Sequence, residues 1–187
     1  MALFSLNELF DVIVMTLVVG FIFKDSFQRP REGYDPLKKY NQFDWNNLWF
    51  SILVTAPAVI FHELAHKFVA MAMGLVAVFH AAYTWLAVGL VMKLLNTGFI
   101  FLVPGFVSTA GATPMQHALI AFAGPALNGV LYLTGFIVLQ TQKKLSHKSV
   151  LLWALTKRIN GFLFIFNMIP IPGFDGFNFF TNLSSIF

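Results

Sequence analysis

The sequence predicts an all-α membrane protein, a bundle of about four to six transmembrane helices. Of its 187 residues, 58% are hydrophobic and only 11% are charged, whereas roughly a quarter of the residues of soluble proteins are charged. The mean hydropathy is +0.74. The apolar residues gather in runs, and about 20 such residues suffice for a helix to cross a bilayer. This length and composition suit one compact bundle.

The first apolar run covers residues 9–23 and ends at Lys24. It lacks both the basic start and the small-residue cleavage site of a secretory signal peptide, so we expect a retained transmembrane helix. Residues 24–47 carry charges of both signs together with proline and glycine, which is typical of a connecting loop. We therefore divide the chain into a first helix with its loop, residues 1–47, and a core formed by residues 48–187.

The core opens with an apolar run of 28 residues, 48–75, that contains the motif His62-Glu63-Leu64-Ala65-His66. Two histidines four residues apart lie on one helical face and can bind the same zinc ion. Glu63 lies about 100° round the helix from His62, where it can act on a metal-bound water. Pro57, one turn earlier, removes a backbone donor, and it either opens the helix beside the metal or merely shapes the bundle.

The next two stretches differ in character. Residues 76–92 are apolar, and their pattern fits a segment that crosses the membrane, dips into it or packs at its surface. Residues 97–113 are rich in β-branched, aromatic and glycine residues, which predicts a short membrane-associated strand or re-entrant region. Because non-helical backbone at membrane depth must be covered by protein or water, we expect this region over the metal site or at the membrane edge. An exposed strand edge there could accept an extended peptide.

Residues 115–140 form a further predicted transmembrane helix, with Gly124 and Asn128 on one face. A short apolar piece, residues 150–155, follows between two basic clusters. We expect the last long helix to start at Ile159 and to place Asn160 and Asn167 on nearly the same side.

The last helix should be disrupted where Pro170 and Pro172 follow it. Asp175-Gly176 comes next. The twelve residues counted from Gly176 would make about 18 Å of helix, too short to span a bilayer.

A catalytic zinc site takes three protein ligands and leaves one position open. After Glu63 no aspartate or glutamate occurs until Asp175, which makes that carboxylate the leading candidate for the third ligand. A distal glutamate is excluded because none follows Glu63. The extended motif HExxHxxGxxH is excluded because Val69 and Ala72 occupy its glycine and histidine positions.

Three further histidines are alternatives for the third ligand: His80, His117 and His147. Each also has a simpler interpretation, respectively as a packing residue, a residue at a helix end and a solvated loop residue. With Asp175 as the third ligand, one zinc ion would activate a water molecule, and Glu63 would transfer its proton to the leaving amine of a cleaved peptide bond. The opposing interpretation is a chance HExxH on a packing or transport helix.

Three separated motifs together resemble the site-2 protease family of intramembrane zinc metalloproteases, especially its prokaryotic members. They are HELAH at 62–66, AGPALN at 123–128 and the run from Asn160 through Asn167 to Asp175-Gly176, which is similar to the family's NxxPxPxxDG. The resemblance implies His62, His66 and Asp175 as zinc ligands and Glu63 as the catalytic acid and base.

The resemblance also implies that Asn128 and Asn167 position the substrate or stabilise the oxyanion. It further implies a membrane-spanning protein as the substrate and a strand region, 97–113, that receives it. The chain departs from the family pattern at Phe174, where Leu or Met is usual, and this changes only packing.

Charge and composition indicate the partners. The net charge of +4 arises from clusters beside apolar segments, which orient a protein against anionic lipid. No stripe of Arg and Lys interleaved with aromatic residues is present, so no nucleic-acid partner is expected.

We expect an integral, multi-pass protein of a prokaryotic cell membrane. The alternative function is a membrane metal-ion transporter that uses the same His and Asp side chains, but it would need a second set of ligands along a path.

Overall fold

The computed structural model of the chain describes residues 3–26, 43–98, 100 and 103–186. Within these ranges the chain forms six helices and two strands. Their order is α1 (Leu6–Phe23), α2 (Trp45–Ala72), β1 (Ala77–Ala81), α3 (Tyr83–Leu94), β2 (Gly105–Thr109), α4 (Pro114–Thr141), α5 (His147–Asn167) and α6 (Asp175–Ser184).

Four of these helices, α1, α2, α4 and α5, are long and apolar enough to cross a membrane. The predicted all-α membrane bundle is therefore confirmed. Most of the predicted polar loop, residues 27–42, lies outside the described residues, and the division of the chain at residue 47 stays a prediction.

Polar side chains fix where the long helices begin. Ser5 and Glu8 form a capping box at the start of α1, and Thr113 and Gln116 form another at the start of α4. Asp44 and Ser146 accept hydrogen bonds from the first turns of α2 and α5. These caps satisfy backbone donors that would otherwise have no partner at a helix start.

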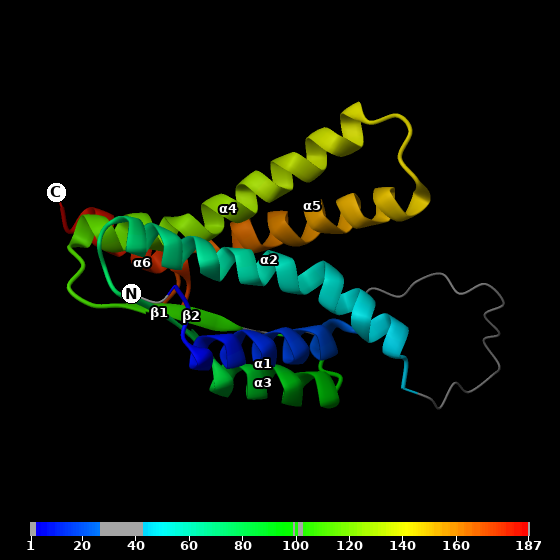
Figure 1. Cartoon of the computed structure of the whole chain (residues 1–187), viewed down its shortest axis with the longest axis horizontal. Helices are drawn as coiled ribbons and strands as arrows, with labels where there is room; N and C mark the ends of the chain where they lie inside the picture. Colours follow the sequence, from blue (N-terminus) through cyan, green and yellow to red (C-terminus); the bar gives the residue numbers. More distant parts are fainter. Residues whose placement is uncertain (1–2, 27–42, 99, 101–102, 187) are drawn as a thin grey trace.

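Helix α2 crosses the middle of the molecule and packs against both α1 and α4 (Figure 1). The α4–α5 hairpin lies on one side of α2, and α1 and α3 lie on the other side. The two strands and α6 gather at the end of the molecule that also holds both chain termini. This end receives the C-terminal half of α2, which carries the HExxH motif.

The two strands pair antiparallel, with Ala77 opposite Thr109 and Ala81 opposite Gly105. Strand β2 lies within the region 97–113 that was predicted to contain a strand. The preceding apolar stretch, 76–92, divides into β1 and the 12-residue helix α3. At about 1.5 Å per residue, α3 is about 18 Å long and cannot span a bilayer alone.

Two carboxylates of α1 cover the outer edge of β1. The backbone N–H of Phe79 donates to Glu8 Oε1 at 2.8 Å, and that of Ala81 donates to Asp11 Oδ2 at 3.1 Å. Lys67 of α2 forms an ion pair with the same oxygen of Glu8. The carboxylates therefore take the place of a neighbouring strand, and in the part of the chain that the structure describes the open edge of this two-stranded sheet belongs to β2.

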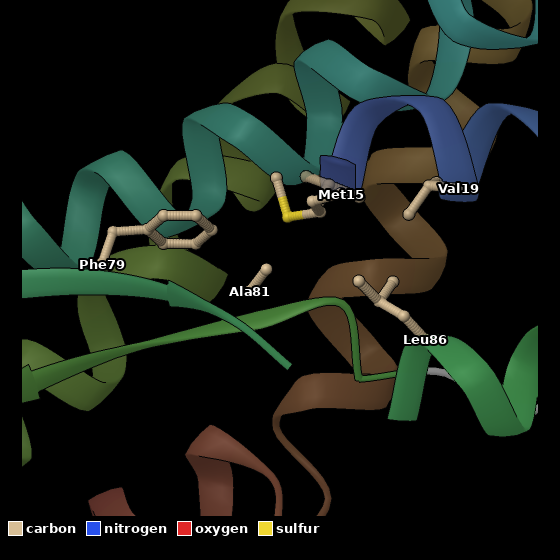
Figure 2. Close-up of a cluster of buried hydrophobic side chains, with 6 residues drawn as sticks. Met15, Val19, Phe79, Ala81 and Leu86 are labelled. Carbon is tan, nitrogen blue, oxygen red and sulfur yellow. The ribbon is translucent and has the colours of Figure 1, made fainter. Parts of the chain in front are cut away.

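Apolar packing fixes α1 to the same strand (Figure 2). Met15 and Val19 of α1 and Leu86 of α3 surround Phe79 and Ala81 of β1 in one buried cluster. The sheet is thus attached to α1 by hydrogen bonds and by hydrophobic contacts.

The expected boundary before the last long helix was wrong. Helix α5 runs without interruption from His147 to Asn167, so the basic pair Lys157-Arg158 lies within a helix. Long basic side chains have good helix propensity, and Lys157 packs its stem near Gly135 with its ammonium 5.7 Å from the ring centre of Phe136. The predicted disruption near Pro170 and the short final helix are confirmed.

Candidate metal centre

Three side chains from two helices meet at one point. His62 and His66 lie one turn apart on α2, and Asp175 is the first residue of α6. The two Nε2 atoms are 3.1 Å apart, and Asp175 Oδ2 lies 3.0 Å from that of His62 and 3.3 Å from that of His66. Among the described residues this is the one cluster of three or more His, Asp or Glu side chains close enough to share a metal ion.

Hydrogen bonds on the far side of each ring set the tautomers. The Nδ1–H of His66 donates to the carbonyl oxygen of Ile120 at 2.6 Å. The Nδ1–H of His62 donates to Asn128 Oδ1 at 2.5 Å. Asn128 must present its oxygen here because its Nδ2 donates to the carbonyl of Ala58 and to Asn160 Oδ1. Both Nε2 atoms therefore carry lone pairs that face Asp175.

The geometry fits a tetrahedral zinc ion. Ligand atoms about 2.0–2.1 Å from such an ion lie about 3.3–3.4 Å from one another, close to the separations of 3.0, 3.1 and 3.3 Å found here. Three acceptor atoms at these distances repel one another unless a cation or proton lies between them.

Gly124 leaves the space that such an ion needs. A Cβ atom at Gly124 would lie only 2.3 Å from His66 Nε2 and 2.7 Å from His62 Nε2. The absence of a side chain at this position of α4 thus keeps the metal-facing side of both imidazoles open.

The Asp175 carboxylate is placed by the sharp connection between α5 and α6. A Cβ on Gly176 would lie 2.4 Å from the backbone of Met168, so only glycine lets the start of α6 approach the end of α5 this closely. Burial raises the pKa of Asp175, but positive charge at this point, from protonated imidazoles of His62 and His66 when no metal is bound or from a cation in their place, outweighs burial and holds the pKa well below its usual range. The ionised form is the one that binds metal.

Comparison with known proteins agrees with this chemistry. A protein of Methanocaldococcus jannaschii named "putative zinc metalloprotease" is 33% identical over 177 residues, which is 92% of this chain and 83% of the relative. The chain belongs to this zinc metalloprotease family. A Synechocystis protein with the same description is 31% identical over 148 residues, 76% of this chain, and the match spans about a third (34%) of that longer relative. No family profile and no solved structure matches the chain.

The cluster of His62, His66 and Asp175, which the sequence predicted as the ligand set, could therefore hold the zinc of this family. The other three histidines are elsewhere. His80 bonds to Ser108 across the sheet at 3.1 Å. His147 begins α5 at the exposed tip of the α4–α5 hairpin. His117, near the start of α4, lines the cavity that adjoins the cluster but does not belong to the cluster.

A cavity of about 1030 Å³ adjoins the zinc site. Its walls include β2, one face of α5 and part of α1, and Glu63 and Asp175 lie in its lining. Glu63 is only 6% exposed, and it makes no hydrogen bond or ion pair with another residue that the structure describes. Its carboxylate is thus available to a molecule in the cavity of this zinc metalloprotease.

The two candidate asparagines have different surroundings. Asn128 is completely buried behind His62, and its amide is shared among protein partners. Asn167 lines the cavity, and its Nδ2 donates to the carbonyl of Leu163. The sequence did not indicate the contributions of Ile120 and Gly176. Any residue type can supply the backbone carbonyl that Ile120 offers to His66, and the close approach of Gly176 to the backbone of Met168 appears only in the folded chain.

Proposed function

We propose that this chain is an intramembrane protease of the site-2 type, which hydrolyses peptide bonds within or near the transmembrane segments of membrane-anchored proteins. One zinc ion per chain would be held by His62, His66 and Asp175. The observation that carries the proposal is that these three acceptor atoms converge at the wall of a large cavity. Two of them belong to α2, which is long and apolar enough to span a membrane.

Zinc bound there would supply a water molecule activated near neutral pH and a positive charge beside the scissile carbonyl. Glu63 accepts the proton of the attacking water and donates it to the leaving amine. Its burial in an apolar helix and the absence of a hydrogen bond to any described residue support this role. Asn128 holds His62 in the tautomer that binds metal, while Asn167 remains the asparagine positioned to touch a substrate.

The open edge of β2 supports a place for the substrate. Phe79 and Ala81 turn their N–H groups away from β2, toward Glu8 and Asp11. In an antiparallel ladder their partners Val107 and Gly105 must then turn their own N–H and C=O groups away from β1. These groups make no backbone hydrogen bond to any described residue, and β2 lines the same cavity as Glu63.

An unwound substrate segment could therefore pair with β2 as an added strand. A transmembrane helix must unwind locally before its carbonyl can be attacked, because its backbone groups are already bonded within the helix. Pairing with β2 would replace the hydrogen bonds lost on unwinding. The partners of the chain are thus the membrane-spanning substrate and the lipid bilayer.

The four candidate spans support a multi-pass protein, and the archaeal and cyanobacterial relatives support a prokaryotic cell membrane. A metal transporter would need further ligands along a path. Within the ranges that the structure describes, no second cluster of His, Asp or Glu with metal-binding spacing is present, so nothing favours that alternative.

The deciding experiment compares wild type, Glu63→Gln and Asp175→Ala for zinc content and for cleavage of a membrane-spanning substrate in detergent or vesicles. Glu63→Gln should keep its zinc and lose cleavage, and Asp175→Ala should lose both. His147→Gln is the matched control, since this histidine lies outside the cluster, and it should keep both. Cleavage by purified Glu63→Gln at the wild-type rate would refute the proposal.

A further inference from the structure

Helix α5 places an exposed arginine at the wall of the cavity. Arg158 lies near the middle of this 21-residue helix, about 13 Å or more along the axis from either end. Cations at such a depth in a membrane-spanning helix normally face a partner or a polar cavity. Arg158 lines the cavity that adjoins the zinc site.

The neighbouring cation faces elsewhere. Lys157 packs toward α4, where its ammonium lies over the ring of Phe136. Arg158 makes no hydrogen bond, ion pair or ring contact with any residue that the structure describes. The pair Lys157-Arg158 thus consists of one cation that lies over an aromatic ring of α4 and one, Arg158, that is exposed and has no partner among the described residues.

The wall around Arg158 is apolar. Leu151, Leu155, Phe162 and Phe166 lie on the same face of α5 and line the same cavity, at the spacing of a single helical stripe. Among the described residues of the lining, Arg158 is the only lysine or arginine, and the only carboxylates are Glu63 and Asp175 at the zinc site. Both of those carboxylates already have roles in the proposed reaction.

Along the axis of α5, Arg158 also lies at nearly the same level as the zinc site. Asn160, two residues farther along α5, accepts a hydrogen bond from Asn128 at 2.8 Å, and Asn128 accepts one from His62. Two residues correspond to about 3 Å along the axis and about 200° of rotation. Arg158 therefore leaves α5 at nearly the level of His62, on the side opposite Asn160.

We propose that Arg158 determines specificity, and that the enzyme selects membrane segments with an aspartate or glutamate close to the scissile bond. This inference rests on the proposed proteolytic function. A guanidinium group binds a carboxylate through two parallel hydrogen bonds, and the apolar surroundings strengthen that pair. A substrate acid would supply the partner that the described part of the protein lacks.

The test uses membrane-segment peptides that carry Glu at successive positions around the cleavage site, each compared with its Gln counterpart. We expect wild type to favour the Glu peptide by about tenfold in kcat/KM, as for one charged hydrogen-bonded pair, at one or two positions only. In Arg158→Gln this ratio should fall to about one, and in Arg158→Glu a Lys peptide should be preferred. The matched control, Lys157→Gln, should keep the wild-type ratio.

Binding measured in Glu63→Gln separates this proposal from the proteolytic one. If tighter binding of the Glu peptide depends on Arg158 while wild type cleaves no peptide, the proposed function fails and the specificity site stands. Equal kcat/KM for all Glu and Gln peptides in wild type would overturn the specificity site. It would also be overturned if Arg158→Gln altered only the response to anionic lipid in the vesicles, because the partner would then be a headgroup.

Discussion

Lys67, the residue that directly follows zinc ligand His66, forms an ion pair with Glu8 of α1 in the protein interior. Their side chains are only 3% and 5% exposed. Glu8 also accepts hydrogen bonds from the backbone of Phe79 and Ser5. The pair thus connects α1, α2 and β1 at one buried point.

Removing one member of this pair should be worse than removing both. Glu8→Gln or Lys67→Met alone leaves a buried charge without its partner and should lower the free energy of unfolding by about 3–5 kcal/mol. The double variant should recover much of that loss. Thermal unfolding in detergent, followed for all four proteins, measures the difference, and equal stability of the single and double variants would contradict the prediction.

Gly124→Ala should abolish zinc binding. The added Cβ would lie within 2.3 Å of His66 Nε2, so one ligand or the backbone of α4 must move. Gly129→Ala, five residues farther along the same helix, is the control because its Cβ would meet the ring of Phe164 at an ordinary 3.4 Å. Metal analysis of the purified proteins should find zinc in Gly129→Ala and not in Gly124→Ala.

Asn128→Leu should weaken zinc binding without removing a ligand. The variant deprives His62 of the acceptor that fixes its tautomer, and loss of such a partner typically costs about 10–100-fold in metal affinity. Asn160→Leu removes the bond to Asn128 and a bond to the carbonyl of Thr156, neither of which involves a proposed ligand, so its effect on zinc should be smaller. Competition with a chelator ranks the variants, and an unchanged affinity in Asn128→Leu would rule out this role.

Val107→Pro should impair substrate binding while preserving the sheet. Proline removes the N–H that faces away from β1, and no bond of the β1–β2 ladder depends on that group. We expect kcat/KM to fall at least about tenfold with zinc content unchanged, since a strand-adding substrate would lose a main-chain partner. Val107→Ala loses packing and keeps the N–H, so it should retain more activity than Val107→Pro.

Much of the fold and of the zinc site follows from the sequence because bilayers impose simple rules. A run of about 20 apolar residues becomes a helix, and the 111 positions without an acid between Glu63 and Asp175 leave few ligands to choose from. The strand β1 was harder to predict, since Ala77–Ala81 is short and its stability comes from hydrogen bonds to Glu8 and Asp11, more than 60 residues earlier.

The continuity of α5 escaped prediction for a related reason. Lys157 and Arg158 suggest a loop when they are compared only with their neighbours in sequence. In the folded chain Lys157 packs on α4 and Arg158 faces a cavity, so neither interrupts the helix. The surroundings that accommodate a charge within an apolar helix are supplied by other segments and are absent from the local pattern.

The carboxylates that α1 places along β1 have a consequence for how the protein is made. Until α1 is in position, the N–H groups of Phe79 and Ala81 and the ammonium of Lys67 have no acceptor, and lipid cannot provide one. Helix α1 also precedes α2 and both strands in the chain, so it leaves the ribosome before them. Assembly of the site on α2 is therefore coupled to the correct insertion of α1, which supplies the acceptors that β1 and Lys67 need when they emerge after it.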